Sequence, residues 1–264
     1  MRVAGLYRYP LKSAAAESLR ATDLEARGLA HDRRWMLVDE QGRFITGRTA
    51  PRLVLLQAEH HAHGLRLSSA DLGELHCELP AVDAPRLAVQ VWNDQVQAVL
   101  VGDQFDRALS RWLGQPCRLV YMDEAALRMQ QLLAAHAGPL SFADAAPLLL
   151  ISETAVDELN ARCPQPMSMQ RFRPNLVIAG CAAHAEDGWQ RLRVGTAELV
   201  TTHACERCGF TSVDPLTAEI AARGEPLRTL ASYRRRNGKP VFGMNAVVAR
   251  SGRVELGDTV TVLD

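Results

Sequence analysis

Short segments in which apolar and polar residues alternate, separated by glycine or Asn-Asp turns, recur along most of this 264-residue chain. A period of two places successive side chains on opposite faces of a β-strand. The alternation is clear in residues 74–79, 86–92 and 95–101, and it returns several times after residue 191. Many short strands joined by tight turns favour a closed or strongly curved barrel. The sequence therefore predicts a mixed α+β, β-rich fold.

Helical spacing is found at fewer places. Apolar residues recur with helical spacing over 103–113 and predict an amphipathic helix that ends at Gly114. Ser152 stands at the N-cap position of a second expected helix. Residues 226–233 suit a short third helix with a proline in its first turn. The fold is thus expected to hold only a few helices.

Other segments have weaker patterns. Residues 53–56 are apolar and predict a strand. The polar connection after them contains His60, His61 and His63 and predicts a solvated loop. Residues 123–144 carry few strand signals and predict a linker or lid.

The charges of the chain balance, with 30 basic and 30 acidic residues, and all but two of the basic residues are Arg. A nucleic-acid coat or a polybasic membrane surface needs a standing positive field, so we expect neither partner. The sequence has no apolar run of 18 residues and no signal peptide at its start. Its six scattered cysteines then predict free thiols in a reducing, cytoplasmic compartment. We expect a monomer.

Cys205 and Cys208 form the strongest local motif, a C-x-x-C pair. Two thiols at this spacing can bind a metal, cycle as a disulfide or supply one reactive thiolate, and both can also be ordinary buried side chains. A closed zinc site needs four ligands, and the sequence has no second C-x-x-C pair. Arg207 precedes Cys208, and its charge would favour a thiolate there, as a soft metal requires.

Cationic side chains that could bind an anion stand elsewhere. Lys12 and Ser13 follow a proline on a fixed turn and offer an ammonium and a hydroxyl. Arg173 precedes Pro174, which disfavours a helix at that position, and a planar guanidinium suits phosphate. The other lysine, Lys239, lies in an expected exposed turn. The local sequence is also compatible with these cations being solvated residues at strand ends that bind no ligand.

Several short motifs follow one another in a fixed order: Tyr9-Pro-Leu-Lys-Ser13, Gly28-Leu-x-x-Asp-Arg-x-Trp35, Phe172-Arg-Pro-Asn175, Ala185-Glu-Asp-x-Trp189, Cys205-x-Arg-Cys208, Thr211-x-Val-Asp-Pro215, Pro226-Leu-x-Thr-Leu-x-x-Tyr-Arg234, Phe242-Gly243 and Gly257-Asp258. In this order the chain resembles, nearly end to end, the MOSC family of molybdenum-cofactor proteins. It is most similar to the branch that contains the mitochondrial amidoxime reducing component and its bacterial counterparts. The resemblance implies an N-terminal MOSC β-barrel-like domain at residues 1–115, packed on a C-terminal MOSC β-barrel domain at 116–264.

The resemblance also implies roles for single residues. Cys208 matches the thiolate that ligates molybdenum, and Asp214 lies beside the metal, where it acts in catalysis or fixes a turn. The positions that match contacts to the pterin cofactor and its phosphate are Lys12, Ser13, Arg33, Ser152, Arg173, Asn175, Glu206, Arg207 and Asn245.

By this resemblance the chain is a molybdenum-cofactor-dependent reductase of N-hydroxylated compounds, such as amidoximes, hydroxylamines and N-hydroxylated base analogues. Electrons are expected from a separate ferredoxin-, flavodoxin- or cytochrome-type protein, because the sequence lacks the fused ferredoxin of some relatives. Detoxification and pyridoxal phosphate binding are further associations of the family. Two alternatives stay open: a carrier of the cofactor or of sulfur, without its own turnover, and a cofactor-free thiol module that uses Cys205 and Cys208.

Overall fold

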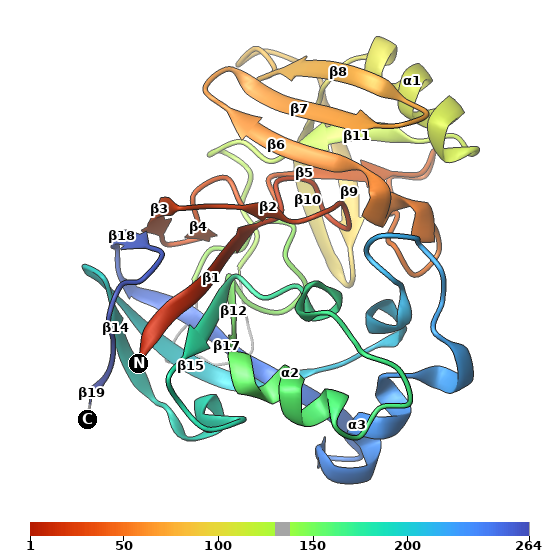
Figure 1. The fold of residues 1–264 in the computed structure, drawn as a ribbon. Coiled ribbons are helices and arrows are strands. Elements are labelled where there is room, and N and C mark those ends of the chain that lie inside the picture. Colours follow the sequence, from red (N-terminus) through yellow and green to blue (C-terminus); the bar gives the residue numbers. More distant parts are fainter. Residues whose placement is uncertain (130–137, 264) are drawn as a thin grey trace.

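The structure is a computed structural model that describes residues 1–129 and 138–263. It is rich in strands and consists of two units, one above the other in Figure 1. We call the part that contains β5 to β11 the upper unit, and the part that contains β1–β4 and β12–β19 the lower unit. The β-rich fold with two packed units and few helices confirms the fold class expected from the sequence.

One long sheet forms most of the lower unit, in the order β19–β14–β15–β17–β12–β13–β1–β2, with β16 beside β17. Its strands are β1 (Arg2–Arg8), β2 (Glu17–Ser18), β12 (Leu148–Ser152), β13 (Leu176–Ala179), β14 (Arg191–Val194), β15 (Ala197–Glu206), β16 (Arg235–Arg236), β17 (Lys239–Arg250) and β19 (Val260–Leu263). A smaller sheet has the order β18–β3–β4, namely β18 (Gly252–Glu255), β3 (Ala21–Glu25) and β4 (Gly28–Leu29). Strands β12 and β13 pair in parallel.

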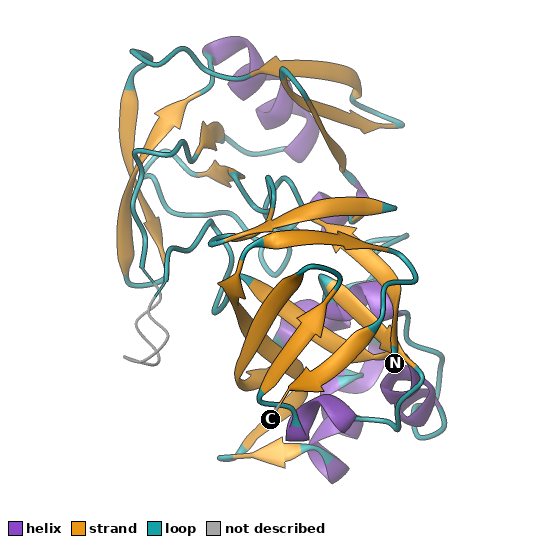
Figure 2. Ribbon diagram, turned by 90° about the vertical axis from the view of Figure 1, so that its left-hand side faces the viewer, coloured by secondary structure: helices purple, strands orange, loops and turns teal. Residues whose placement is uncertain are grey.

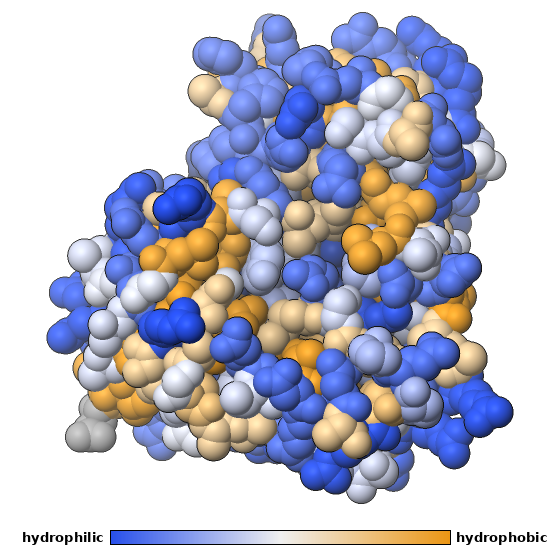
Figure 3. Space-filling view, viewed as in Figure 1, coloured by the Kyte–Doolittle hydropathy of each residue, from blue (hydrophilic) through white to orange (hydrophobic). Residues whose placement is uncertain are grey.

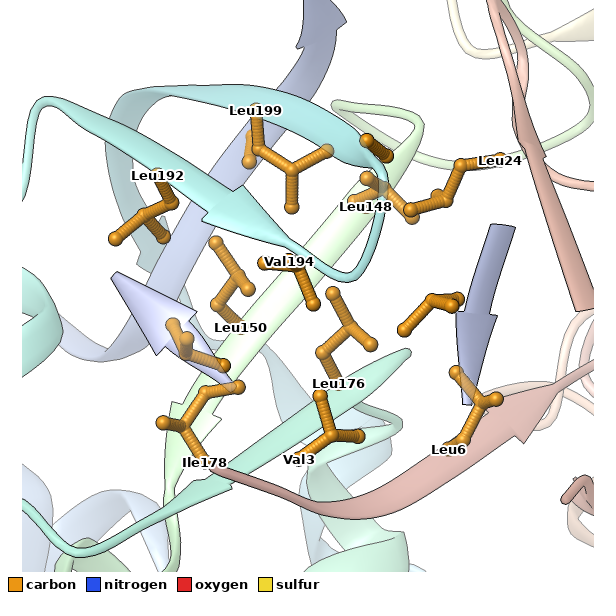
Figure 4. Close-up of a cluster of buried hydrophobic side chains, with 14 of the residues drawn as sticks. Val3, Leu6, Leu24, Leu148, Leu150, Leu176, Ile178, Leu192, Val194 and Leu199 are labelled. Atoms are coloured by element: carbon orange, nitrogen blue, oxygen red, sulfur yellow. The ribbon is translucent and has the colours of Figure 1, made fainter. Parts of the chain in front are cut away.

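Aliphatic side chains from both sheets of the lower unit meet in one core. Because side chains alternate along each strand, one face of every strand is directed to this core. Figure 4 shows Leu24, Leu150, Leu176 and Leu199, which come from four different strands, pointing toward one another. Aromatic residues make up only 5% of the chain, and the core accordingly consists mainly of Leu and Val.

The upper unit holds a four-stranded sheet, β5–β11–β10–β9, and a three-stranded sheet, β6–β7–β8. These strands are β5 (Trp35–Val38), β6 (Gln57–His61), β7 (Gly64–Ser69), β8 (Gly73–Glu78), β9 (Arg86–Val91), β10 (Asp94–Leu100) and β11 (Arg118–Tyr121). Helix α1 (Asp103–Leu113) contributes Leu109 and Trp112 to the core of this unit, and Figure 2 shows the helix beside the strands.

Helix α1 ends at Gly114, whose φ of +77° is the left-handed conformation that glycine adopts readily, as the sequence predicted. The other expected helices are present as α2 (Glu153–Asn160) and α3 (Leu227–Tyr233). Both pack in a separate apolar cluster that includes Phe172 and Phe242. Among the described residues, no helix is long and apolar enough to span a bilayer.

The first 30 residues belong to the lower unit. Strand β1 pairs with β13, and β3 pairs with β18, so the sheets join the two ends of the chain. The division at residue 115 therefore stays a prediction about sequence domains, because the lower unit contains residues from both sides of it.

Two expectations about the upper unit are wrong. Residues 53–56 are not a strand: Pro51–Leu55 form the 3₁₀ helix η1, in which Pro51 supplies the fixed φ of a first turn. His60 and His61 are not in a solvated loop but on β6, which pairs with β7. Polar residues are tolerated on this strand because it lies at the edge of its sheet.

Part of the expected linker or lid, residues 130–137, lies outside the described residues. The segment after it packs against the molecule. Phe142 is fully buried, and Asp144 stands at the point where the chain enters the lower unit. Figure 3 shows apolar patches at the level at which the two units meet, below a mainly hydrophilic upper surface.

Candidate functional site

The fully buried side chain of Tyr9 is the centre of a cationic cluster. The guanidinium carbons of Arg33 and Arg173 lie 4.5 and 4.0 Å from the centre of its ring. The Tyr9 hydroxyl donates to the carbonyl of Pro174 at 3.0 Å, which fixes the ring. Burial raises the pKa of Tyr9 above its ordinary value, so the phenol stays neutral. The ring face thus holds two cations in place.

Arg33 is fixed by the side chains of its neighbour Asp32 and of Asn175, which comes from a distant segment. Its Nη1 donates to Asn175 Oδ1 at 3.2 Å and also contacts the Asp32 carboxylate. Asp32 in turn accepts the backbone N–H of Tyr9 at 2.8 Å. Burial opposes the charge on Arg33, but Asp32 outweighs it and the pKa of Arg33 is raised. Both ends of the Asn175 amide are engaged, since Oδ1 also accepts the backbone N–H of Leu149 at 3.2 Å and Nδ2 donates to the carbonyl of Tyr7 at 3.2 Å.

One buried amino group of the Arg173 guanidinium has no hydrogen-bond partner among the described residues. Its Nη1 donates to the Ala14 carbonyl at 2.7 Å, whereas Nη2 is buried without a partner among the described residues. Burial lowers the pKa of Arg173 to about 10, so the side chain is still charged at neutral pH. Buried N–H groups are nearly always paired, so this one is placed for an anionic or carbonyl ligand.

Three of the predicted contacts share an unusual backbone. Ser13, Arg33 and Arg173 have φ values of +69°, +49° and +56°. The conformation of Arg173 confirms that Pro174 keeps it out of a helix. Few non-glycine residues adopt positive φ, and such strain concentrates at binding sites, where the surrounding structure maintains it.

Lys12, three residues after Tyr9, is also buried. Its Nζ donates to the Phe142 carbonyl and to Asp144 Oδ1, both at 2.6 Å. Burial lowers the pKa of Lys12, although Asp144 acts in the opposite direction. For Asp144, the partial loss of hydration is outweighed by Lys12, and the pKa of the carboxyl lies well below its usual range. The same Asp144 oxygen accepts the indole N–H of Trp92 at 3.0 Å.

Cys208 is exposed and follows strand β15, immediately before the 3₁₀ helix η5 (Gly209–Ser212). The residues on both sides of it contact the segment that carries Arg173. Arg207 Nη2 donates to the Phe172 carbonyl at 2.8 Å, and the ring of Phe210 lies 5.3 Å from the Arg173 guanidinium carbon. An accessible thiol therefore stands next to the cationic cluster.

The expected effect of Arg207 on Cys208 needs correction. The guanidinium Nη1 of Arg207 lies 2.8 Å from Cys205 Sγ, not against Cys208. Cys205 and Arg207 are two residues apart on extended backbone, so their side chains share one side of the strand. Cys208, the residue after Arg207, is exposed.

Asp214 uses both carboxylate oxygens in the protein. Oδ2 accepts Arg171 Nη2 at 2.5 Å, and Oδ1 accepts the backbone N–H groups of Leu216 and Thr217 at 2.8 and 3.2 Å. The second set is an Asx turn. Of the two roles considered for Asp214, these contacts are those of a turn-fixing residue.

Two further predicted contacts are engaged elsewhere. Ser152 stands at the N-cap position of α2, as expected, but its hydroxyl accepts the backbone N–H of His184 at 2.9 Å. The Glu206 carboxylate accepts Lys239 Nζ at 2.6 Å, and both of these side chains are exposed. The structure therefore places neither Ser152 nor Glu206 in the cluster around Tyr9.

Asn245 is buried on β17 and pairs with a residue that the sequence did not single out. Its Nδ2 lies 3.0 Å from Nε2 of His203 on β15. Burial lowers the pKa of His203, so the imidazole is neutral at physiological pH. The adjacent strands β15 and β17 thus pair Asn245 with a histidine that lies two residues before Cys205.

Several functional candidates were missed by sequence reasoning: Tyr9, Phe44, Trp92, Asp144, His203 and Phe210. Only Tyr9 lay in a motif, as its first residue. Trp92 and Asp144 occupy a turn and an irregular segment, so no periodicity marks them. Lys12, one of only two lysines in an Arg-rich chain, was the nearest signal, but the sequence does not show which carboxylate it pairs with.

These side chains fit a cofactor that carries both an anionic group and a metal that binds a thiolate. Three cations, an unpartnered buried N–H on Arg173 and an accessible Cys208 thiol lie in one region. A phosphate suits the cations, and a thiolate suits a soft metal. Groups of three or more His, Cys, Asp or Glu side chains that could hold a metal on their own are absent from the described residues.

Comparison with known proteins gives the same assignment along nearly the whole chain. Residues 1–116 match the MOSC N-terminal beta barrel domain, and residues 137–261 match the MOSC domain. Mitochondrial amidoxime-reducing component 1 of Mus musculus is 34% identical over 279 residues, covering 99% of this chain and 82% of that protein. The Homo sapiens protein of the same name is 33% identical over 283 residues, covering 99% and 82%.

Another relative differs in length. Molybdenum cofactor sulfurase of Oryza sativa subsp. japonica is 31% identical over 264 residues, which cover 89% of this chain but only 31% of that protein. The similarity to both kinds of protein includes the two domains found here. The chain therefore belongs to the MOSC family, in the group of proteins that combine a MOSC N-terminal beta barrel domain with a MOSC domain.

Proposed function

We propose that this protein is a molybdenum-cofactor-dependent reductase that converts N-hydroxylated compounds to the corresponding amines or amidines. The N–O bond breaks, two electrons and two protons are consumed, and water leaves with the reduced product. The names of the relatives support this class of reaction, since several that match 98–99% of this chain are amidoxime-reducing components. Amidoximes, hydroxylamines and N-hydroxylated base analogues are the proposed substrates.

One observation carries the proposal. Arg207 and Phe210, on either side of Cys208, both contact the segment of Arg173, whose guanidinium retains an unpartnered buried N–H. The Cys208 segment therefore lies against the segment of Arg173, which supports an accessible thiol near an anion-binding position. A cofactor with both a metal and a phosphate needs this combination.

The residues of the chain divide the binding of the cofactor between them. Lys12, Ser13, Arg33 and Arg173 hold the phosphate, and the Cys208 thiolate ligates the metal. Asn175 and Asp32 keep Arg33 in position through the contacts described above. When bound, the molybdenum cofactor supplies the two-electron redox chemistry for removal of oxygen. Asp214 and Glu206 act outside this set, in a turn and in a surface ion pair.

Electrons come from a separate redox protein of the ferredoxin, flavodoxin or cytochrome type, and the proposed location is the cytoplasm. The proposed working state is a monomer. The balanced charge of the chain supports a protein without nucleic-acid or membrane partners. The alternative function is a carrier that binds the cofactor, or a sulfurated form of it, and passes it on. The match to molybdenum cofactor sulfurase favours keeping this alternative.

Turnover of the loaded protein separates the two functions. The protein is purified from a host that makes the cofactor, its molybdenum content is measured, and benzamidoxime is added with reduced viologen as an artificial electron donor. Benzamidine formation that scales with molybdenum content supports the reductase. Full molybdenum occupancy without benzamidine formation would contradict the reductase and leave the carrier.

A further inference from the structure

We propose that Arg48 and Trp92 of the upper unit form a substrate-recognition subsite for N-hydroxylated compounds that carry a planar ring and an anionic group. The inference rests on the function proposed above and names a substrate class for the same site. The indole would stack on the ring of the substrate, and the guanidinium would bind its anionic group.

Trp92 is held in a conformation that exposes an aromatic ring. It follows β9 at the tip of the β9–β10 hairpin, which in Figure 1 extends from the upper unit toward the lower one. Its φ is +56° and it remains 41% exposed. A large residue is unfavourable in the left-handed region, and an exposed indole forgoes burial. Both costs are understandable if the ring has a ligand to contact.

Three neighbours keep the indole of Trp92 in place. Its N–H donates to Asp144 at 3.0 Å, and its ring centre lies 5.3 Å from that of Phe44. The guanidinium carbon of Arg48 lies 4.5 Å from the ring centre. An aromatic side chain fixed in this way loses little further entropy when it binds a ligand.

Arg48 offers a free cation beside this ring. It is exposed, and among the described residues its guanidinium has one side-chain hydrogen-bond partner, the Thr46 hydroxyl, at 3.4 Å from Nε. Within residues 1–129 and 138–263, no carboxylate lies within ion-pair distance of it. Arg33 and Arg173, by contrast, are largely buried and already hold fixed positions. An exposed cation suits a ligand that binds and leaves, rather than a resident phosphate.

The subsite adjoins the Cys208 segment. Phe210, two residues after Cys208, packs against Gly47: a Cβ built on Gly47 would lie 2.3 Å from Phe210 Cε2. Arg48 is the next residue along the chain. On the other side, Asp144 links Trp92 to Lys12 by accepting hydrogen bonds from both. Recognition residues of the upper unit therefore border the proposed metal and phosphate positions.

Three substrates separate the contributions of ring and anion: acetamidoxime has neither, benzamidoxime has the ring, and 4-carboxybenzamidoxime has both. We expect Arg48→Ala to raise KM for 4-carboxybenzamidoxime about tenfold, the effect of one lost charge-assisted contact, and for benzamidoxime less than about twofold. Trp92→Ala should raise KM for both aromatic substrates about fivefold, as expected for a lost stacking contact, and leave acetamidoxime unchanged.

Arg52→Ala is the matched control, because Arg52 also lies over a tryptophan, Trp112 at 4.8 Å, but pairs with Asp71. It should change none of the three KM values. Equal changes for all three substrates in Arg48→Ala would overturn the proposal. A loss of molybdenum and pterin from purified Arg48→Ala would overturn it as well, since the anion bound would then belong to the cofactor.

Binding without turnover keeps this test independent of the proposed function. The product 4-carboxybenzamidine is titrated into the holoprotein, and tryptophan fluorescence is followed. Saturable quenching in the wild type, absent in Trp92→Phe and shifted about tenfold in Arg48→Ala, supports the subsite even if no amidoxime is reduced. Identical quenching in the wild type and Trp92→Phe contradicts the subsite even if the enzyme is active.

Discussion

Lys12 Nζ lies 2.6 Å from Asp144 Oδ1, although 132 positions separate the two residues in the chain. The ammonium is buried, whereas the carboxylate is 58% exposed and also accepts the indole N–H of Trp92. The pair therefore ties three segments together: the turn after β1, the entrance to β12 and the tip of the β9–β10 hairpin.

Removal of this carboxylate should cost stability. We expect Asp144→Ala to lower the free energy of unfolding by about 1–3 kcal/mol, because Lys12 would stay buried with the Phe142 carbonyl as its remaining partner. Asp71→Ala, which breaks the exposed pair with Arg52, should change it by less than about 1 kcal/mol. Urea denaturation of the three proteins measures both. Equal losses in the free energy of unfolding for Asp144→Ala and Asp71→Ala would contradict a larger stabilising role for the Lys12–Asp144 pair.

Gly47 should tolerate no side chain while Phe210 is present. A Cβ at Gly47 would lie 2.3 Å from the Phe210 ring, so Gly47→Ala should destabilise the protein by about 1–3 kcal/mol. Gly188→Ala is the control, since no atom lies within 4 Å of its Cβ position. In the Phe210→Ala background, Gly47→Ala should lower the free energy of unfolding by less than it does in the wild type. Additive losses in this cycle, measured by urea denaturation, would rule out the contact.

The stacked imidazoles of His31 and His60 should make stability depend on pH. Their ring centres lie 3.5 Å apart, and burial, then His31 and Arg8, lower the pKa of His60 to about 3. Since the folded pKa is below the unfolded value of about 6.5, the stabilising contribution is present above that pH and is lost as the pH falls toward 3.

We therefore expect His60→Gln to flatten the decline of the urea midpoint between pH 7 and pH 4. The Gly64 backbone acts on the pKa of His60 in the opposite direction. The backbone N–H of His60 also lies 3.4 Å from Glu17 Oε2, and Glu17 pairs with Arg8. The exposed His63 provides the control, because His63→Gln should leave the slope unchanged. The same slope in His60→Gln as in the wild type would contradict this explanation.

The two lysines should differ in their effect on cofactor retention. Lys12→Gln removes a cation from the proposed phosphate position, and we expect at least about a tenfold lower pterin content per protein. Lys239→Gln breaks only a surface pair with Glu206 and should retain the wild-type content. Pterin fluorescence after oxidative release measures both. The thermal midpoint of each variant is recorded alongside, and equal retention in two folded variants would contradict the assignment of Lys12.

The sequence predicted elements well where one physical signal acted alone. The helical spacing of residues 103–113 followed by Gly114 defined α1 to the residue, because only a left-handed cap explains that glycine. The strand predicted at residues 53–56 was wrong, because a run of four apolar residues suits a buried strand and a buried turn equally. Pro51, just before them, was the discriminating residue.

The site was predictable only as far as its motifs extend. Lys12, Arg33, Arg173 and Cys208 stand in motifs, and the structure brings their segments together. Asp144 could not be found, because its contact with Lys12 depends on how distant segments meet, and no local pattern encodes that. The direction of the Arg207 side chain, toward Cys205, followed from strand alternation and could have been deduced.

Molybdenum content, measured by elemental analysis on freshly purified protein, tests the central claim most directly. In a cofactor-competent host, the wild type should hold molybdenum and pterin. Cys208→Ala should lose the metal-dependent activity and most of the molybdenum, whereas Cys205→Ala should keep much of both, because its thiol faces Arg207. Equal molybdenum loss in the two variants, or a wild type without molybdenum but with a reversible Cys205–Cys208 disulfide, would contradict the account.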